Sequence, residues 1–244
     1  MRSLARPLPR LVLVLVTAAV ISVPSGTAGA ATGDRFRLDF DEGQSLAVGT
    51  KVTDVSGLGN GGVVRSSSGG VITPAGGRAV YPRLCTTEPC PNAIIEIADS
   101  PQLDPGTAPF EYGATVVLAA NQTSTGQNII QKGTFDASGQ WKLQVDNIAG
   151  QPSCRIRGFN GSHVLKNIRV VSSVSIADGQ PHQVMCRKTS TGLQILIDGV
   201  GRGTSASGKL DITNSSSVTV GGRNTAQNND QFQGALDDVY MRLI

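Results

Sequence analysis

The sequence has few aromatic residues and few charged ones. Phe, Trp and Tyr together make up 4% of the 244 residues, and Asp, Glu, Lys and Arg make up 16%. A site built on several stacked rings, as many single-stranded nucleic-acid sites are, would have few rings to use. Hydrophobic residues make up 39% and the 30 glycines follow no three-residue period. This composition argues against a disordered or collagen-like chain.

A surplus of charge of one sign is also absent from most of the chain. The net charge of +3 comes from Arg2, Arg6 and Arg10, because the remaining sequence has 18 basic and 18 acidic residues. Nucleic acids and anionic membranes are bound mainly through a surplus of Lys and Arg. We therefore expect neither of them as a partner.

Only one long hydrophobic run is present, at the amino terminus. It covers residues 11–23, follows three arginines and precedes Ala28-Gly29-Ala30, which has small residues where a signal peptidase reads them. A membrane anchor is the alternative, but it needs about 20 apolar residues, and Pro24 ends this run early. Residues 1–30 are therefore predicted to be a secretory signal peptide. Residues 31–244 are predicted to be one secreted, extracellular domain without membrane contact after cleavage.

The four cysteines are an even number, which suits disulfide formation in an oxidising compartment. Of the three possible pairings we favour Cys85 with Cys90, which bracket a short loop containing Pro89, and Cys154 with Cys186. The second bond would join two strand-like segments, and loop-closure entropy gives it roughly 3 to 4 kcal/mol. Neither pair has the CxxC spacing of a zinc site.

Apolar side chains recur at every second residue, which is the period of a β-strand with one buried face. No stretch of twelve residues has a clear helical period, and segments rich in Gly, Asn, Asp and Ser separate the candidate strands. The pattern predicts an all-β fold of antiparallel sheets packed face to face, a sandwich or jelly roll. The clearest alternating groups are Phe36/Leu38/Phe40, Trp141/Leu143/Val145 and Leu193/Ile195/Ile197.

Several segments occur in a fixed order along the chain: FD and DVSGLGN near the start, then DGQPHQV, GLQILIDGV, VTVGG and FQGALDDVY in the last third. The series resembles the laminin G-like, concanavalin A-like lectin/glucanase superfamily, whose modules run DGxWHxV, a strand ending in DG, a strand ending in GG, and FxGxIDxV. The resemblance implies an antiparallel two-sheet jelly-roll sandwich. Non-catalytic relatives bind glycans or proteins through a concave sheet or its rim loops.

The last strand has an irregular pattern. Val239, Met241 and Leu243 are apolar at odd positions, whereas the preceding apolar residue, Leu236, is at an even one. The alternation therefore slips by one residue across Asp237-Asp238. A β-bulge there would return every apolar side chain to the core face.

Acidic side chains near both ends of the domain suggest a metal site. In relatives of this fold the opening strand lies beside the closing one, and a structural Ca²⁺ is common there. Hard oxygen ligands suit that ion; alternatively, the acids are solvated or pair with neighbouring arginines. The resemblance implies Asp39 or Asp41 together with Asp237 as candidate ligands, and carbonyl oxygens of the turn from Asp54 to Asn60 as further ones.

Motifs for catalysis are missing from the sequence. Its four glutamates, Glu42, Glu88, Glu96 and Glu111, do not form the ExDxxE strand of the related glucanases. His163 and His182 have no GxSxG segment to accompany them. We assign no catalytic residue, and we expect His182 to be a structural histidine with satisfied hydrogen bonds.

Two places are candidates for ligand binding. Trp141, the only tryptophan, could stack on a sugar ring, with Phe135 among the rings that could assist it. Trp141 is also in phase with Leu143 and Val145, which favours a core position instead. The second candidate is a polar loop between two of the family strands, with Asn224, Asn228, Asn229 and Asp230.

The sequence thus predicts a secreted binding module that recognises an extracellular glycan, or serves adhesion, without catalysis. Two alternatives stay open. One is a glycoside hydrolase or polysaccharide lyase of the same superfamily, and the other is a structural module that binds a cell-surface protein. We expect a monomer.

Overall fold

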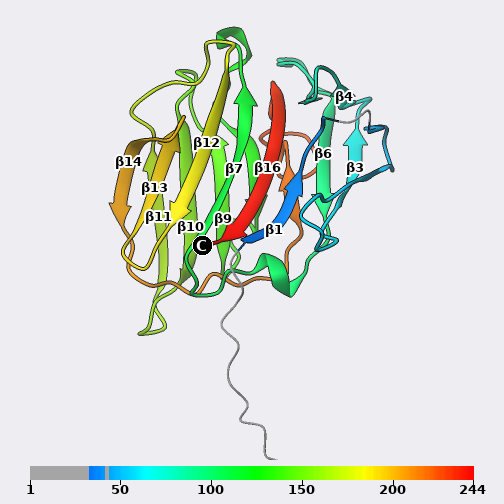
Figure 1. The fold of residues 1–244 in the computed structure, drawn as a ribbon. Coiled ribbons are helices and arrows are strands. Elements are labelled where there is room, and N and C mark those ends of the chain that lie inside the picture. Colours follow the sequence, from blue (N-terminus) through cyan, green and yellow to red (C-terminus); the bar gives the residue numbers. More distant parts are fainter. Residues whose placement is uncertain (1–32, 42–43) are drawn as a thin grey trace, which may run out of the picture.

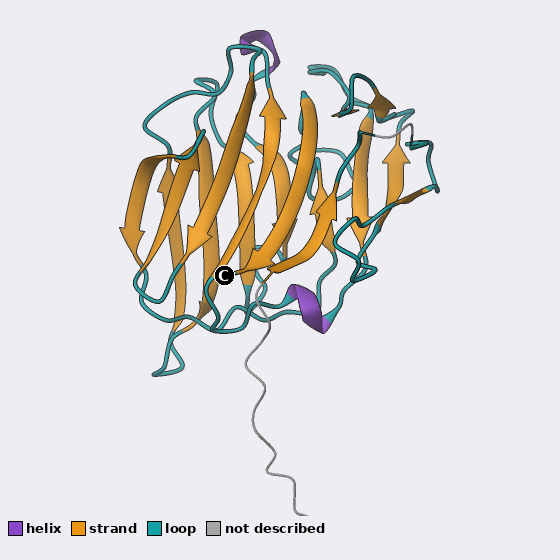
Figure 2. Cartoon of the chain, viewed as in Figure 1, coloured by secondary structure: helices purple, strands orange, loops and turns teal. Residues whose placement is uncertain are grey.

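The computed structural model describes residues 33–41 and 44–244, so the predicted signal peptide lies outside the described residues. Within these ranges, two antiparallel sheets face each other (Figure 1, Figure 2). Two short 3-10 helices lie between strands, η1 (Pro101–Leu103) and η2 (Ala120–Gln122). No helix of the described residues has the length and apolar character needed to cross a membrane. The predicted all-β, two-sheet jelly-roll sandwich is confirmed.

The first sheet, called sheet A, contains the closing strand at its centre. β16 pairs with β7 on one side and with β1 and β5 on the other, and Figure 1 shows β1 directly beside β16. In spatial order its strands are β14 (Val200–Ala206), β13 (Gly192–Ile197), β12 (Pro181–Lys188), β7 (Phe110–Val117), β16 (Ala235–Leu243), β5 (Ala79–Val80) and β4 (Thr73–Pro74), with β1 (Gly33–Leu38) paired to β16.

The second sheet, called sheet B, has three consecutive antiparallel hairpin connections at one end, from β8 to β11. β15 then joins this half to the strands from the early segments of the chain. In spatial order its strands are β11 (Leu165–Val171), β10 (Pro152–Phe159), β9 (Gln140–Val145), β8 (Gln127–Lys132), β15 (Val218–Val220), β6 (Asn92–Ile97), β3 (Gly62–Ser67) and β2 (Lys51–Val52).

The alternation read from the sequence defines the core between the sheets. All three predicted groups are buried, at 36/38/40, 141/143/145 and 193/195/197, with no side chain of theirs more than 4% exposed. Burying one such apolar side chain stabilises the fold by about 1.5–3 kcal/mol. The residues between them point outward, so each sheet keeps one face for the core and one for the surroundings.

A disulfide and two rings join the sheets through this core. Cys154 of β10 is bonded to Cys186 of β12, and both are fully buried. Beside them the ring centroids of Tyr112 and Trp141, from opposite sheets, are 5.1 Å apart. The Tyr112 hydroxyl donates a hydrogen bond to the Arg155 carbonyl oxygen at 3.0 Å. The expected pairing is confirmed here, and also for Cys85 with Cys90.

The predicted bulge in β16 is confirmed. Its register against β7 shifts between Asp237 and Tyr240, and Asp238 has a φ of +47°. Leu236 and Val239 are both fully buried although they are three residues apart. The bulge therefore restores the core face, and it leaves Asp238 and Tyr240 on the outer face of sheet A.

We predict that Trp141→Ala lowers the free energy of unfolding by about 3 to 5 kcal/mol, because it leaves a large cavity between the sheets. Phe135→Ala is the matched control, since that ring is 57% exposed and its loss should cost less than about 1 kcal/mol. Urea titration of both variants measures the difference. Equal midpoints for the two variants would contradict a core role for Trp141.

Candidate functional site

Polar side chains line a hollow on the outer face of sheet B, which we call the sheet B hollow. Its volume is about 270 Å³. Its floor comes from the outward positions of β8 and β9, because their alternate residues face the core. Three glutamines of this floor, Gln131, Gln140 and Gln144, are at most 4% exposed. The remaining lining residues include Thr134, Phe135, Lys142, Asp146, Arg155, Arg223 and Asp230.

Phe135 supplies the aromatic surface of this hollow. It lies in the turn between β8 and β9 and is 57% exposed. The guanidinium carbon of Arg157 lies 4.9 Å from its ring centroid, and that of Arg155 lies 5.9 Å away. These cation–π contacts orient a ring that the core does not hold. From the sequence Phe135 was expected only as an assisting ring, although the turn signal Ala137-Ser138-Gly139 beside it indicated an exposed position.

Trp141, by contrast, offers no surface to a ligand. It is fully buried and its ring packs on Tyr112. The expectation of a sugar platform at Trp141 is therefore wrong, and the in-phase core position with Leu143 and Val145 is confirmed. The physical reason is the strand period, which places all three side chains on the same face of β9.

The predicted rim loop lies at the side of the sheet B hollow. Asn224 and Asn228 are exposed, and the Asp230 carboxylate lies 3.7 Å from the Lys142 ammonium. Arg223 donates a hydrogen bond to the Asn228 carbonyl oxygen at 2.7 Å. Asn229 is 2% exposed and donates to the Asn224 carbonyl oxygen. The Asn229 amide thus holds the loop together, and a ligand contact by this residue, which also lines the hollow beside the Cys85–Cys90 loop, stays a prediction.

Two further hollows share lining residues with the sheet B hollow. A second hollow of about 410 Å³ over β3, β6 and β15 shares Arg223 with it. A third of about 310 Å³, beside the Cys85–Cys90 loop, shares Asp230. We call the three hollows together the depression; Arg223 and Asp230 are the charged residues that they share.

Several buried polar atoms in this region have no hydrogen-bond partner among the described residues. They are Asn128 Oδ1, Gln140 Oε1, Thr219 Oγ1 and Gln233 Oε1, and the last three belong to side chains that line the depression. A buried polar atom without a partner costs free energy, so it is a place where a ligand hydroxyl or water would be stabilised. Burial also lowers the pKa of Lys142, and the carboxylates of Asp230 and Asp146 oppose that effect.

A second group of predicted site residues lies on the other sheet, at the β1 end. Carboxylate oxygens of Asp39, Asp41 and Asp237 all lie within 4.8 Å of one another. Burial raises the pKa of Asp237, and the negative charges of Asp238 and Asp41 raise it further. Because the three donors are hard oxygens that repel one another, their chemistry fits a divalent cation such as Ca²⁺.

The Asp54 carboxylate does not join this acidic cluster, which corrects the expected ligand set, and metal ligation by carbonyl oxygens of the turn 54–60 stays a prediction. The Asp54 carboxylate accepts hydrogen bonds from the backbone nitrogens of Arg37 at 3.0 Å and Asn60 at 2.8 Å. Burial raises the pKa of Asp54, but these bonds and those from Ser56 outweigh it and leave the pKa lowered. The Asn60 amide donates to the Arg35 carbonyl oxygen at 2.8 Å. Both residues therefore fasten the turn 54–60 to β1.

His182 is a structural histidine, as expected. Its Nδ1 lies 2.7 Å from Asp198 Oδ2 and its Nε2 lies 3.2 Å from the Asp178 carboxylate. Burial lowers the pKa of His182, but the hydrogen bonds and charges of these two carboxylates outweigh it and raise the pKa above its usual value. The three residues join the start of β12 to the turn that follows β13.

Because the folded state raises the pKa of His182, the contribution of this residue to stability is fully present below the unfolded pKa of about 6.5. This contribution is lost as the pH rises through the pKa that His182 has in the folded state. We predict that His182→Gln removes this fall in the free energy of unfolding. Urea titrations of both proteins at pH values from about 5 to 8 measure it. Parallel pH profiles for the two proteins would contradict the assignment.

Comparison with known proteins agrees with this architecture. Residues 99–241 match the family model of the concanavalin A-like lectin/glucanases superfamily. No curated protein matches the sequence.

Among solved structures, domain 4 of AbnA is similar over most of both chains. AbnA is a GH43 extracellular arabinanase from Geobacillus stearothermophilus, and the domain was solved in complex with arabinotriose. It is 14% identical, and the match covers 87% of this chain and 93% of that chain with a TM-score of 0.60.

The binding domain of botulinum neurotoxin DC is also similar. In complex with SialylT it is 15% identical, with 85% of this chain and 47% of that chain covered and a TM-score of 0.57. In complex with rat synaptotagmin II it is 14% identical, and the match covers 85% of this chain and 48% of that chain with a TM-score of 0.55. The chain thus spans about half the length of the toxin domain. At these identities the likeness shows the fold.

Proposed function

Because the chain belongs to the concanavalin A-like lectin/glucanases superfamily, we propose that it is a secreted binding module that recognises carbohydrate without transforming it. The observation that carries the proposal is the sheet B hollow, where buried glutamine amides lie beside the exposed ring of Phe135. A sugar ring has an apolar face of C–H groups and a rim of hydroxyls. An aromatic ring suits the first. Side-chain amide atoms without a partner among the described residues, such as Gln140 Oε1, suit the second.

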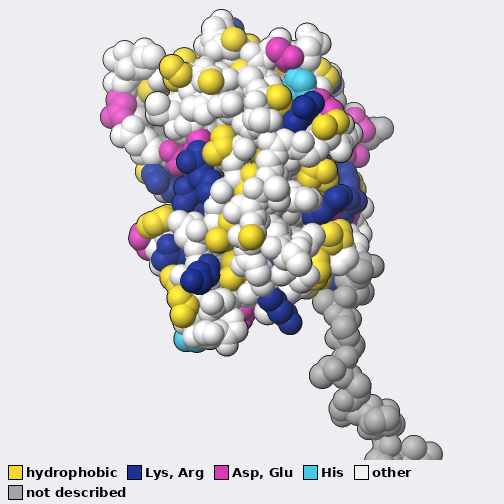
Figure 3. All heavy atoms as spheres, turned by 90° about the vertical axis from the view of Figure 1, so that its left-hand side faces the viewer, with side chains coloured by type: hydrophobic (Ala, Val, Ile, Leu, Met, Phe, Trp, Pro, Cys, Tyr) yellow, Lys and Arg dark blue, Asp and Glu magenta, His cyan; other side chains and the backbone are white. Residues whose placement is uncertain are grey.

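The sheet B hollow carries charges of both signs, with Lys142, Arg155 and Arg223 beside Asp146 and Asp230. Lys142 is close to Asp230, and Asp146 forms an ion pair with Arg169. Figure 3 views the molecule from the side of β11 and β14, and shows Lys and Arg side chains on both flanks with acidic side chains next to them. Since both acids of the hollow are already in ion pairs, neither is placed as a free carboxylate for acid–base chemistry.

The similar structures support the same proposal at the level of the fold. The AbnA domain was solved with arabinotriose and the toxin domain with SialylT. The toxin domain was also solved with rat synaptotagmin II, so a protein partner is the second candidate, with the exposed rim residues Asn224 and Asn228 as its contact. The two disulfides, one that closes the loop 85–90 and one that is buried between the sheets, support secretion, because such bonds persist in oxidising compartments.

A glycan array with the purified chain tests the proposal, and Phe135→Ala tests the site. We predict about tenfold weaker retention of the bound glycan for this variant, because stacking on the ring is lost. Its melting temperature should stay unchanged, since the ring is exposed. Val71→Ala is the control, at a side chain that is 56% exposed and lines none of the hollows.

Three outcomes of this experiment would contradict the proposal in different ways. A blank array argues for the protein partner. Full retention by Phe135→Ala places the glycan elsewhere on the molecule. Release of free sugar from the retained glycan favours the hydrolase or lyase alternative.

We also propose that Asp39, Asp41 and Asp237 hold a structural Ca²⁺. The ion would supply positive charge to three carboxylates that otherwise repel one another. Asp39 and Asp41 follow β1 while Asp237 belongs to β16, so a bound ion would fasten the first strand of the domain to the last.

We predict that calcium raises the melting temperature of the chain relative to EDTA, because an ion that binds only the folded state stabilises it. Asp237→Asn should abolish the response, and the exposed turn variant Asp136→Asn should keep it. Differential scanning fluorimetry measures both. Identical melting curves in calcium and in EDTA would exclude the site.

A further inference from the structure

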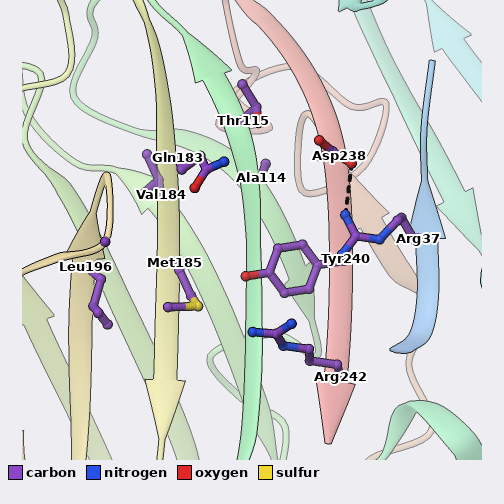
Figure 4. A pocket seen from close by; sticks show the side chains of 11 residues that line it. Arg37, Ala114, Thr115, Gln183, Val184, Met185, Leu196, Asp238, Tyr240 and Arg242 are labelled. Carbon is purple, nitrogen blue, oxygen red and sulfur yellow. Dashed lines mark hydrogen bonds and ion pairs between the residues drawn. The ribbon is translucent and has the colours of Figure 1, made fainter. Parts of the chain in front are cut away.

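The outer face of sheet A contains a separate hollow that none of the preceding roles uses. We call it the Tyr240 hollow; its volume is about 260 Å³ (Figure 4). β1, β7, β12, β13 and β16 all contribute to it, so it lies on the side of the sandwich opposite the sheet B hollow. Its lining includes Thr115, Gln183, Met185, Leu196 and Asp238 around Tyr240.

The side chain of Tyr240 extends from β16 over the neighbouring strand β7. In Figure 4 the ring projects from β16 toward β7, with its hydroxyl on the side of Met185. Gly113 of β7 makes this possible, because a Cβ at that position would lie 3.3 Å from the Tyr240 hydroxyl oxygen and 2.5 Å from the Val184 carbonyl oxygen. The absence of a side chain at residue 113 therefore lets the ring lie against the sheet.

Two arginines hold the ring in place. The guanidinium carbon of Arg37 lies 4.9 Å from the ring centroid, and that of Arg242 lies 5.4 Å away. Arg37 forms ion pairs with Asp34 at 2.9 Å and with Asp238 at 2.8 Å. A ring fixed in this way is preorganised, so binding would cost little conformational entropy.

The charges of the Tyr240 hollow are balanced. Glu111 is 1% exposed and forms ion pairs with both Arg187 and Arg242. Arg37 adds its ion pairs with Asp34 and Asp238. In total, three arginines on β1, β12 and β16 are paired with three carboxylates on β1, β7 and β16. An anionic or cationic ligand would therefore gain little attraction here, which favours a neutral one.

Unused polar groups surround the ring. The hydroxyls of Tyr240 and Thr115 and the amide of Gln183 form no side-chain hydrogen bond with any residue that the structure describes, while Met185 and Leu196 give the hollow an apolar wall. An aromatic face, an apolar wall and free hydroxyl and amide groups match the two sides of a sugar ring. The volume is below the range of about 300–1,000 Å³ for drug-sized ligands, which suits a single ring.

We propose that the Tyr240 hollow is a second carbohydrate site, which takes one neutral sugar ring against Tyr240. The inference rests on the proposed function in that it assumes carbohydrate recognition by this chain. The two sheets pack about 10 Å apart and the sites face in opposite directions. The module could therefore hold two separate stretches of glycan at once and link two chains.

Methyl NMR of the full chain labelled at the methionine methyl groups tests the second site. Met185 lines the hollow, whereas Met241 is fully buried and serves as the internal reference. The probes are three neutral trisaccharides: arabinotriose, cellotriose and mannotriose. We expect at least one of them to shift the Met185 signal in the wild-type chain and in Phe135→Ala alike, since that ring belongs to the opposite sheet.

Substitution of the ring completes the test. Tyr240→Ala should weaken the titration at Met185 about tenfold and leave retention on the glycan array, which depends on Phe135, unchanged. Tyr240→Phe keeps the ring and should weaken the binding measured at Met185 two- to tenfold, because one hydrogen bond is lost. A folding defect of the alanine variant therefore does not decide the outcome.

Two results would overturn the inference. If the Met185 signal responds to none of the three probes while the array retains a glycan, the second site is wrong and the proposed function stands. If Met185 responds equally in wild type and in both Tyr240 variants, the ligand does not use the ring. A blank array together with a silent Met185 signal removes both proposals.

Discussion

The core between the two sheets is the constraint on which every other feature of this molecule depends. The strands in the middle of each sheet give alternate residues to that core, and the buried Cys154–Cys186 bond joins the two layers across it. Because one face of each sheet is used in this way, the other face is free to take any side chain that the strand tolerates. The sheet B hollow and the Tyr240 hollow are two different uses of that freedom, one based on buried amides and one on a ring held by arginines.

The sequence was sufficient for the features that follow from period and order. Two-residue alternation located the core strands, and the slip between Leu236 and Val239 located the bulge. The order of the family-like segments indicated the jelly roll and brought Asp41 near Asp237, because it implied that the first and last strands are neighbours. These are long-range consequences of patterns that are visible locally.

The sites themselves were harder to predict, for identifiable reasons. Phe135 lies in a turn, where exposure follows no period, so only the turn composition beside it, and not the spacing of apolar residues, indicated an exposed ring. Tyr240 depends on Gly113, which lies on the neighbouring strand and is 127 residues away in sequence. Asp54 and Asn229 have side chains of the ligand type, yet the Asp54 carboxylate accepts from backbone amides of β1 and of its own turn, and the Asn229 amide donates to a carbonyl of its own loop.

The extra residue in β16 has a consequence for how this domain can change over generations. If one of the two aspartates were deleted, Leu236 and Val239 would be two positions apart, the spacing of an uninterrupted strand, and both would still point inward. The strand thus contains a length of chain that the interior does not require. Insertion or deletion at this point would alter the acidic groups on the surface while leaving the packed layers as they are. Substitution elsewhere in the strand does not offer this route to new surface chemistry.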